Sequence, residues 1–169
     1  TFLCHPNIIK MYGFFDDETH IYIILEVGTG GQLYHQLRKA EPLPENRVAA
    51  IMKQVCDAVN EIHSLRIIHR DIKPENILFN CSTVKICDFG WAVHCGNSMR
   101  KTVAGSPLYY SPEIVQEQKY DEKIDIWSIG MMTYECLLGK IPFRIYSELD
   151  LNRIVIDEIK FPEYIDVSE

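Results

Sequence analysis

The segment IIHRDIKPENILF, residues 67–79, places a dense group of polar side chains between two short apolar runs. The apolar pair before this group and the apolar run after it have the composition of short strands. Charged residues at this density between two strand-like runs indicate a loop with a function. The polar group contains Arg70, Asp71, Lys73, Glu75 and Asn76.

Asp71, Lys73 and Asn76 have the chemistry that phosphoryl transfer requires. That reaction needs a carboxylate that orients the attacking hydroxyl and accepts its proton, ligands that hold Mg²⁺ on the phosphates, and a cation near the transferred group. Asp71 is expected to be the base and Lys73 the cation. Asn76 and, in the following Asp-Phe-Gly sequence, Asp88 are expected to bind Mg²⁺.

Length and composition describe an ordinary globular domain. With 169 residues, 47% of them apolar and 24% charged, the chain is expected to form one domain. No apolar run approaches the roughly 18 residues of a membrane span, and no basic start followed by an apolar core suggests a signal peptide. The net charge of -7, without a basic stripe, argues against binding of nucleic acid. We therefore expect an intracellular protein with no membrane or nucleic-acid partner.

The six cysteines and six histidines show no metal-binding spacing. No two cysteines form a C-x-x-C pair and no histidines form H-E-x-x-H, so a zinc site is not expected. Reduced thiols in an intracellular protein are the simplest interpretation of the cysteines.

Hydrophobic periodicity predicts a small strand-bearing start followed by a mostly helical region. Apolar residues at three- and four-residue steps predict a long helix at Pro44, and a nearly all-apolar stretch predicts a buried helix that Gly139 ends. Residues 88–113 show little periodicity and are predicted to form one long, functional loop. Strands are predicted over residues 8–15, 21–27, 77–79 and 84–87, and helices over residues 32–39, 44–65, 124–138 and 147–156.

Three short motifs occur in order along the chain. They are His69-Arg70-Asp71 with Asn76, then Asp88-Phe89-Gly90, then Ser111-Pro112-Glu113. Their order and spacing resemble the signatures of eukaryotic protein kinases. The resemblance covers essentially the whole chain and implies an α+β, protein-kinase-like fold.

The resemblance makes the chain a single, partial kinase domain. Residues 1–27 are similar to the end of the N-lobe, residues 28–31 to the hinge region, and residues 32–169 to a mostly helical C-lobe that ends before helix H. The start of the N-lobe, with its Gly-rich loop, strand lysine and C-helix glutamate, is therefore expected to be missing, together with the last C-lobe helices. By itself the fragment is expected to be inactive.

Two features resemble Ser/Thr kinases in particular. Lys73 stands two residues after Asp71, and the segment GSPLY, residues 105–109, is similar to the substrate loop of that class. The resemblance implies transfer of the γ-phosphate of ATP, with Mg²⁺, to Ser or Thr hydroxyls of protein substrates. Ser106 occupies the position where that class has a hydroxyl near the base.

Within the Ser/Thr kinases, the chain most resembles the Aurora family. The sequence DFGWAVH, with Trp91 and His94, carries this resemblance, and HPNIIKMYGFF, YDEKIDIWSIG and GKIPF agree with it. Ser111 in place of the family's proline, and GSPLYYSPE as a whole, are also similar to NIMA-related kinases. A NIMA-related or polo-like kinase is therefore one alternative, and a non-catalytic pseudokinase or scaffold is another. The complete set of catalytic and Mg²⁺-binding residues favours an enzyme.

The resemblance also implies roles around the nucleotide and the long loop. Glu26 and Gly28 are similar to the hinge positions whose backbone binds adenine, and Leu78 is similar to the residue beneath the adenine ring. Thr102 aligns with the phosphorylated threonine of the activation loop. Arg70 is the expected partner of that phosphate.

Glu75 resembles an acid that meets a basic residue of the substrate, so we expect protein substrates with basic residues near the phosphorylated site. Asp125 is expected to accept hydrogen bonds from the catalytic-loop backbone, since a carboxylate in so apolar a helix needs partners. Activators of the Aurora type, and a location in the nucleus and at the centrosome and spindle, follow from the resemblance alone. The remaining structural positions that the resemblance implies are His69, Phe89, Gly90 and Glu113.

Overall fold

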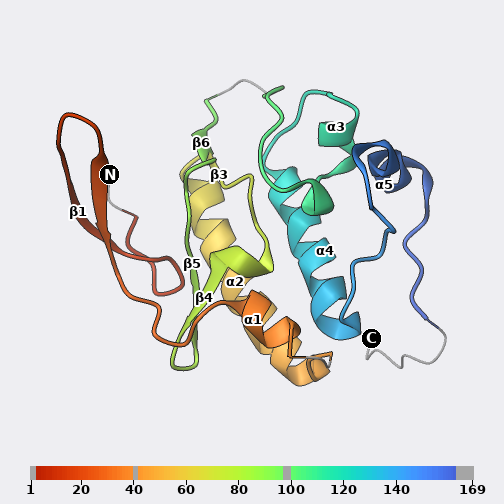
Figure 1. Cartoon of the computed structure of the whole chain (residues 1–169), viewed down its shortest axis with the longest axis horizontal. Coiled ribbons are helices and arrows are strands. Elements are labelled where there is room, and N and C mark those ends of the chain that lie inside the picture. The colour runs from red at the N-terminus through yellow and green to blue at the C-terminus, as the bar shows by residue number, and fades with distance from the viewer. Residues whose placement is uncertain (1–2, 40–41, 97–99, 163–169) are drawn as a thin grey trace.

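The structure is a computed structural model, and it describes residues 3–39, 42–96 and 100–162. It is an α+β arrangement in which small antiparallel sheets accompany two long helices (Figure 1), as the expected fold class requires. The strands are β1 (Met11–Asp16), β2 (Ile21–Leu25), β3 (Ile67–Ile68), β4 (Ile77–Asn80), β5 (Thr83–Ile86) and β6 (Val93–His94). The α-helices are α1 (Leu33–Leu37), α2 (Glu45–Ser64), α3 (Pro112–Val115), α4 (Lys123–Leu138) and α5 (Arg153–Ile156), and 3₁₀ turns cover Pro74–Asn76, Pro107–Tyr109 and Glu148–Asn152.

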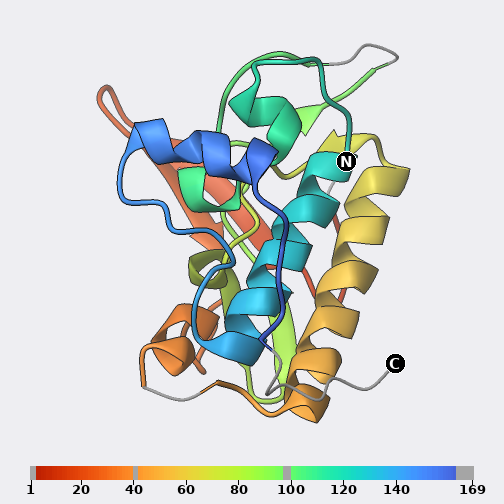
Figure 2. The same cartoon turned by 90° about the vertical axis from the view of Figure 1, so that its right-hand side faces the viewer.

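The two long helices, α2 and α4, form the centre of the core and lie side by side (Figures 1 and 2). α2 buries an apolar stripe at three- and four-residue spacing, as an amphipathic helix does when one face is turned inward. α4 is apolar on most of its sides, and Met131, Met132 and Cys136 are almost completely buried. Gly139 follows α4 with φ of 69°, the left-handed conformation that commonly ends a helix. Both helices closely match the predicted ranges.

β1 and β2 form a hairpin that extends away from the helical core (Figure 1). The prediction that the first strand starts at Ile8 was wrong, because this part of the chain bonds to β5 instead. Ile8 and Ile9 are buried, and the Ile9 N–H donates to the Ile86 carbonyl at 2.9 Å. The strand of the hairpin therefore begins at Met11.

The segment over residues 28–31 runs against β4, which directly follows the loop over residues 69–76, called the catalytic loop below. The Gly30 N–H donates to the Phe79 carbonyl at 2.8 Å, and the Phe79 N–H donates to the Gly31 carbonyl at 2.9 Å. A Cβ atom added to Gly30 would lie 2.7 Å from the Phe79 Cβ atom. This close approach of the two backbones requires glycine.

Two predicted segments are more structured, or differently structured, than expected. The 88–113 segment contains β6, a 3₁₀ turn and the start of α3, and β6 pairs with β3. The predicted helix over residues 147–156 is a 3₁₀ turn followed by the short helix α5. A capping box between Ser147 and Asp150 starts that 3₁₀ turn. None of the helices in the described part of the chain has the length and apolar character needed to cross a membrane.

Candidate active site

Asp71 lies at the centre of a hydrogen-bonded cluster and is only 4% exposed. The Ser106 hydroxyl donates to its Oδ1 atom at 2.8 Å, and the Asn76 amide donates to its Oδ2 atom at 2.9 Å. The Nζ atom of Lys73 lies 2.8 Å from the same Oδ2 atom and donates to the Ser106 oxygen at 2.7 Å. The structure therefore brings four of the predicted site residues together around one carboxylate.

Two opposing effects act on the pKa of Asp71. Burial raises the pKa because the charged form loses water, whereas hydrogen bonds from Lys73, Ser106 and Asn76, together with the charge of Lys73, lower it. The lowering is larger, so the pKa of Asp71 lies below its ordinary value. Asp71 is therefore a charged carboxylate at neutral pH, able to orient a hydroxyl group and accept its proton.

Gly105 determines how closely Ser106 approaches the catalytic loop. Its φ is 99°, and a Cβ atom there would lie 2.1 Å from the Arg70 carbonyl oxygen. Only glycine tolerates both the left-handed conformation and this contact. The Tyr110 hydroxyl donates to the Gly105 carbonyl at 3.0 Å and stabilises the same turn.

Asp125, in the first turn of α4, is 1% exposed and shapes the catalytic loop. Its Oδ2 atom accepts the His69 N–H, and its Oδ1 atom accepts the Arg70 N–H, both at 2.9 Å. Arg70 has φ of 68°, which is uncommon for a residue with a side chain, so these bonds hold an otherwise unfavourable turn. His63 of α2 adds a third contact, with its Nε2 atom 2.8 Å from Oδ2. The sequence alone gave His63 no role, because the six histidines of the chain follow no recognisable spacing.

His69 is fully buried and packs edge-on against Phe89, with ring centroids 4.8 Å apart. Burial lowers the pKa of His69 more than the neighbouring acids and the Cys87 carbonyl raise it, so the ring is neutral. Its Nδ1 atom accepts the Asp71 N–H at 3.3 Å, and its Nε2 atom lies 3.1 Å from the Cys87 carbonyl and donates to it. His69 therefore packs, as a neutral ring, between the catalytic loop and the Asp-Phe-Gly segment.

Asn76 and Asp88 are the candidate Mg²⁺ ligands, and the Cys87 N–H joins their segments by donating to the Asn76 carbonyl at 3.0 Å. Asp88 is exposed, and its Oδ1 atom accepts the Gly90 N–H at 3.2 Å. A carboxylate and an amide offer the oxygen donors that Mg²⁺ prefers, and Mg²⁺ on a nucleotide needs few protein ligands. The pair therefore fits Mg²⁺ carried by phosphates. Across residues 3–39, 42–96 and 100–162, no group of three or more His, Cys, Asp and Glu could hold a metal ion alone.

An apolar cavity of about 530 Å³ lies beside Asp88, between the hairpin and the core. Met11 and Leu25 reach it from the hairpin, and Phe89 reaches it from the Asp-Phe-Gly segment. Side chains from the hairpin and from the Asp-Phe-Gly segment therefore line the same cavity, next to the candidate Mg²⁺ ligand Asp88. The other lining residues are Leu3, Ile8, Ile9, Ile23 and Gly90.

The predicted adenine-binding residues Glu26, Gly28 and Leu78 lie in one region. The Glu26 carboxylate forms an ion pair with Lys85 at 2.9 Å, and Lys85 is the strand partner of Leu78. The hydrogen bond from Lys85 lowers the pKa of Glu26, against the raising effect of burial. A Cβ atom at Gly28 would lie 2.9 Å from the Leu78 Cβ atom, so the backbone at Gly28 lies close to that side chain. Sequence reasoning missed Lys85, which looks like an ordinary exposed strand position.

Arg70 and Thr102 belong to a second hydrogen-bonded group. The Nε atom of Arg70 donates to the Trp91 carbonyl at 2.6 Å, and its Nη1 atom donates to the Tyr120 hydroxyl at 3.1 Å. Thr102 is exposed, which leaves its side chain accessible to a modifying enzyme. The predicted pairing of Arg70 with a phosphate on Thr102 stays a prediction.

Glu75 lies in an acidic site that the sequence revealed only in part. Its Oε2 atom is buried and has no hydrogen-bond partner among the described residues. The charge of Glu75 acts on Glu135 of α4, whose carboxylate accepts the Tyr109 hydroxyl at 2.5 Å. Burial raises the pKa of Glu135, the Tyr109 hydrogen bond lowers it, and the charge of Glu75 raises it further. An unpaired carboxylate oxygen next to a second acid suits a cationic side chain.

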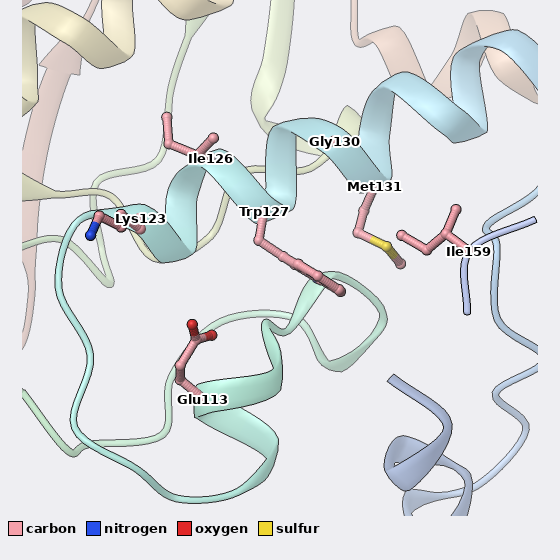
Figure 3. A pocket seen from close by; sticks show the side chains of 7 residues that line it. All are labelled: Glu113, Lys123, Ile126, Trp127, Gly130, Met131 and Ile159. Atoms are coloured by element: carbon pink, nitrogen blue, oxygen red, sulfur yellow. The ribbon is translucent and has the colours of Figure 1, made fainter. Parts of the chain in front are cut away.

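Glu113 of α3 lines a mainly apolar groove of about 450 Å³ beside α4. Figure 3 shows its carboxylate pointing toward α4. Among the described residues, the buried Trp127 Nε1 atom has no hydrogen-bond acceptor. The other residues along the groove are Lys123, Ile126, Gly130, Met131 and Ile159.

The chain is similar to known proteins along nearly its whole length. The family model described as the protein kinase domain matches residues 1–168. Over 165 residues and 96% of this chain, the sequence is 41% identical to Aurora kinase A-B of Xenopus laevis, 40% to Aurora kinase B of Danio rerio and 41% to Aurora kinase C of Mus musculus. The match spans 40%, 52% and 60% of those relatives, respectively. The motifs, the site and the family match together show that the chain belongs to the protein kinase domain family.

Proposed function

We propose that the complete protein is an ATP-dependent Ser/Thr protein kinase of the Aurora type. The observation that carries this proposal is the cluster of Asp71, Lys73, Asn76 and Ser106, in which a charged carboxylate already holds a hydroxyl group. The likeness to Aurora kinases supports the Ser/Thr class. The chain spans about half the length of these relatives, so the activity is proposed for the complete protein.

The roles of the residues follow from their positions. The Oδ1 atom of Asp71 accepts the Ser106 hydroxyl at 2.8 Å, which supports a role for Asp71 in orienting the substrate hydroxyl and accepting its proton. Lys73 bridges Asp71 and Ser106 and places a positive charge where negative charge builds up during transfer. Asn76 and Asp88 would hold Mg²⁺, which neutralises charge on the phosphates of ATP when it is bound.

A basic substrate residue fits the pair formed by Glu75 and Glu135. A guanidinium group carries a positive charge and five N–H donors and would complement the two neighbouring carboxylates, whereas a neutral side chain would leave their repulsion uncompensated. Phosphorylation of Thr102, Aurora-type activators, and a location in the nucleus and at the centrosome and spindle belong to the same proposal. The likeness to Aurora kinases supports them, and imaging of the tagged complete protein through mitosis tests the location.

A kinase assay on the complete protein tests the activity. We expect transfer of γ-phosphate to a serine peptide with an upstream arginine, and Asp71→Asn should lower kcat by about 10²- to 10⁴-fold. Asp57→Asn, at an exposed ion pair on α2, is the matched control and should leave kcat unchanged. Transfer by Asp71→Asn at the unmodified rate would overturn the proposed role of Asp71.

The same assay tests recognition of the basic residue. Replacing the peptide arginine by alanine should lower kcat/KM about tenfold in the unmodified enzyme and have much less effect in Glu75→Gln. An equal loss in both enzymes would show that Glu75 does not bind the arginine.

A further inference from the structure

Tyr120 connects Arg70 of the catalytic loop to the 88–113 segment. It lies in the loop between α3 and α4 and is only 3% exposed. Its backbone pairs with that of Arg100 in an isolated antiparallel bridge, with N–H to carbonyl distances of 2.9 and 3.0 Å. Its ring packs in a small apolar cluster with Ile68 and Cys95. Backbone and ring therefore fix the position of the phenol group.

The Tyr120 hydroxyl forms the middle of a hydrogen-bonded chain. It accepts a hydrogen bond from Arg70 Nη1 at 3.1 Å and donates one to the Thr102 carbonyl at 2.6 Å. The Nε atom of Arg70 meanwhile donates to the Trp91 carbonyl at 2.6 Å. One guanidinium group is thus joined to the segment at two points, directly at Trp91 near its start and through Tyr120 at Thr102 near its middle.

A phosphate on Thr102 would form a link of the same kind, since a phosphorylated side chain bonds to arginine and orders a loop. In the unmodified chain the phenol already links Arg70 to residue 102, through the backbone carbonyl and not through the side chain. The threonine side chain is therefore not needed for this link.

We propose that Tyr120 is a positioning residue that holds the 88–113 segment against Arg70 before any phosphorylation of Thr102. Phosphorylation then strengthens an arrangement that exists already. The enzyme without a phosphate on Thr102 keeps a substantial basal activity that depends on the Tyr120 hydroxyl. This inference rests on the proposed kinase function, and it makes the phenol and the phosphate two partly redundant links to the same arginine.

The test compares four forms of the complete protein. They are the wild-type enzyme and the Tyr120→Phe variant, each with Thr102 phosphorylated and after phosphatase treatment. Tyr120→Phe should lower kcat about tenfold in the dephosphorylated form and less than about threefold in the phosphorylated form. The matched control is Tyr134→Phe, which removes another hydroxyl that donates to a backbone carbonyl, that of Lys160 at 2.9 Å. Tyr134→Phe should change kcat by the same small factor in the phosphorylated and dephosphorylated forms. Equal losses for Tyr120→Phe in both forms, or no loss in either, would overturn the proposal.

A second measurement does not depend on catalysis. Trypsin cuts after Arg100 and Lys101, next to Thr102, and Tyr120→Phe should speed this cut several-fold in the dephosphorylated protein while Tyr134→Phe does not. An unchanged rate would contradict the positioning role. If the unmodified enzyme transfers no phosphate, the proposed function fails, and the trypsin result still decides whether Tyr120 holds the segment.

Discussion

The hairpin of β1 and β2 and the helical part around α2 and α4 differ in how fully their side chains are buried and hydrogen-bonded. In the helical part, Asp125 is 1% exposed and its carboxylate accepts two backbone N–H groups and contacts His63. In the hairpin, large apolar side chains on both faces meet solvent in the described structure. They include Tyr12, Phe14, Phe15, Ile21, Tyr22, Ile23, Ile24 and Leu25.

The difference shows where the geometry of the site comes from. The contacts that arrange the catalytic loop lie within the described helical part, so this half of the site is held by short, specific bonds. The hairpin carries apolar surface that the described residues leave uncovered, and apolar patches of this kind mark an interface or cause aggregation. A substitution should therefore have very different consequences in the two regions.

The largest effect is expected from Asp125→Ala in the complete protein. Loss of this buried carboxylate leaves two catalytic-loop N–H groups without their acceptor, so the free energy of unfolding should fall by about 3–5 kcal/mol, and activity should fall with it. Denaturant unfolding measures the change. Asp57→Ala, at a surface ion pair, is the control and should cost less than about 1 kcal/mol. Similar losses for both variants would mean that the carboxylate does not hold the loop.

The next effect is expected from Gly105→Ala. The added methyl group would meet the Arg70 carbonyl oxygen at 2.1 Å, so the backbone must move and Ser106 must leave Asp71. The free energy of unfolding should fall by about 1–3 kcal/mol, and kcat should fall more than tenfold. Gly13→Ala in the hairpin is the control, because nothing lies within 4 Å of its added Cβ atom. Full activity in Gly105→Ala would contradict the tight approach.

A smaller effect is expected at the ion pair of Glu26 and Lys85, which ties the hairpin to β5. Lys85 lowers the pKa of Glu26 below its ordinary value of 4.5. The stabilisation is therefore fully present above pH 4.5 and is lost as the pH falls through the lower pKa of the folded state. Lys85→Met should cost about 1 kcal/mol at neutral pH. In unfolding curves between pH 3 and pH 7, its difference from the unmodified protein should shrink toward the acid end, and a constant difference would rule out the charge effect.

The smallest effect on stability is expected in the hairpin itself. Phe14→Ser, at a side chain that is 66% exposed, should change the free energy of unfolding by less than about 0.5 kcal/mol. It should reduce aggregation of the 169-residue chain, which light scattering measures. Val55→Ser in α2, at a fully buried position, is the contrast and should lower the free energy of unfolding by about 1–3 kcal/mol. A large loss of stability for Phe14→Ser would show that the hairpin is not the exposed region described above.

Periodicity and motifs predicted much of the molecule, and particular residues show why. α2 and α4 follow from apolar spacing, which is local in sequence, and Asp71, Lys73 and Asn76 stand close together in one loop. Ser106 joins them from a distant segment, and resemblance alone indicated that it would.

Other contacts have no local signal. Tyr120 looks like an ordinary aromatic residue before a helix, and only the fold places its hydroxyl between Arg70 and Thr102. Glu135 lies in an apolar helix, and only the fold brings it within the electrostatic influence of Glu75, which is far away in sequence. The start of the first strand was predicted wrongly for a related reason, since Ile9 bonds to β5, which no period within its own segment reveals.

The contacts of Asp125 also determine when the catalytic loop can fold during protein synthesis. Asp125 follows His69 and Arg70, which it holds, by 56 and 55 residues. A ribosome adds about 5–20 residues per second, so roughly 3–11 seconds separate the making of the catalytic loop from the making of the residue that shapes it. During that interval the nascent chain carries its catalytic residues without their geometry. A ribosome that stalls just before it adds Asp125 would therefore carry the complete catalytic-loop sequence on a chain that lacks the carboxylate that holds the loop.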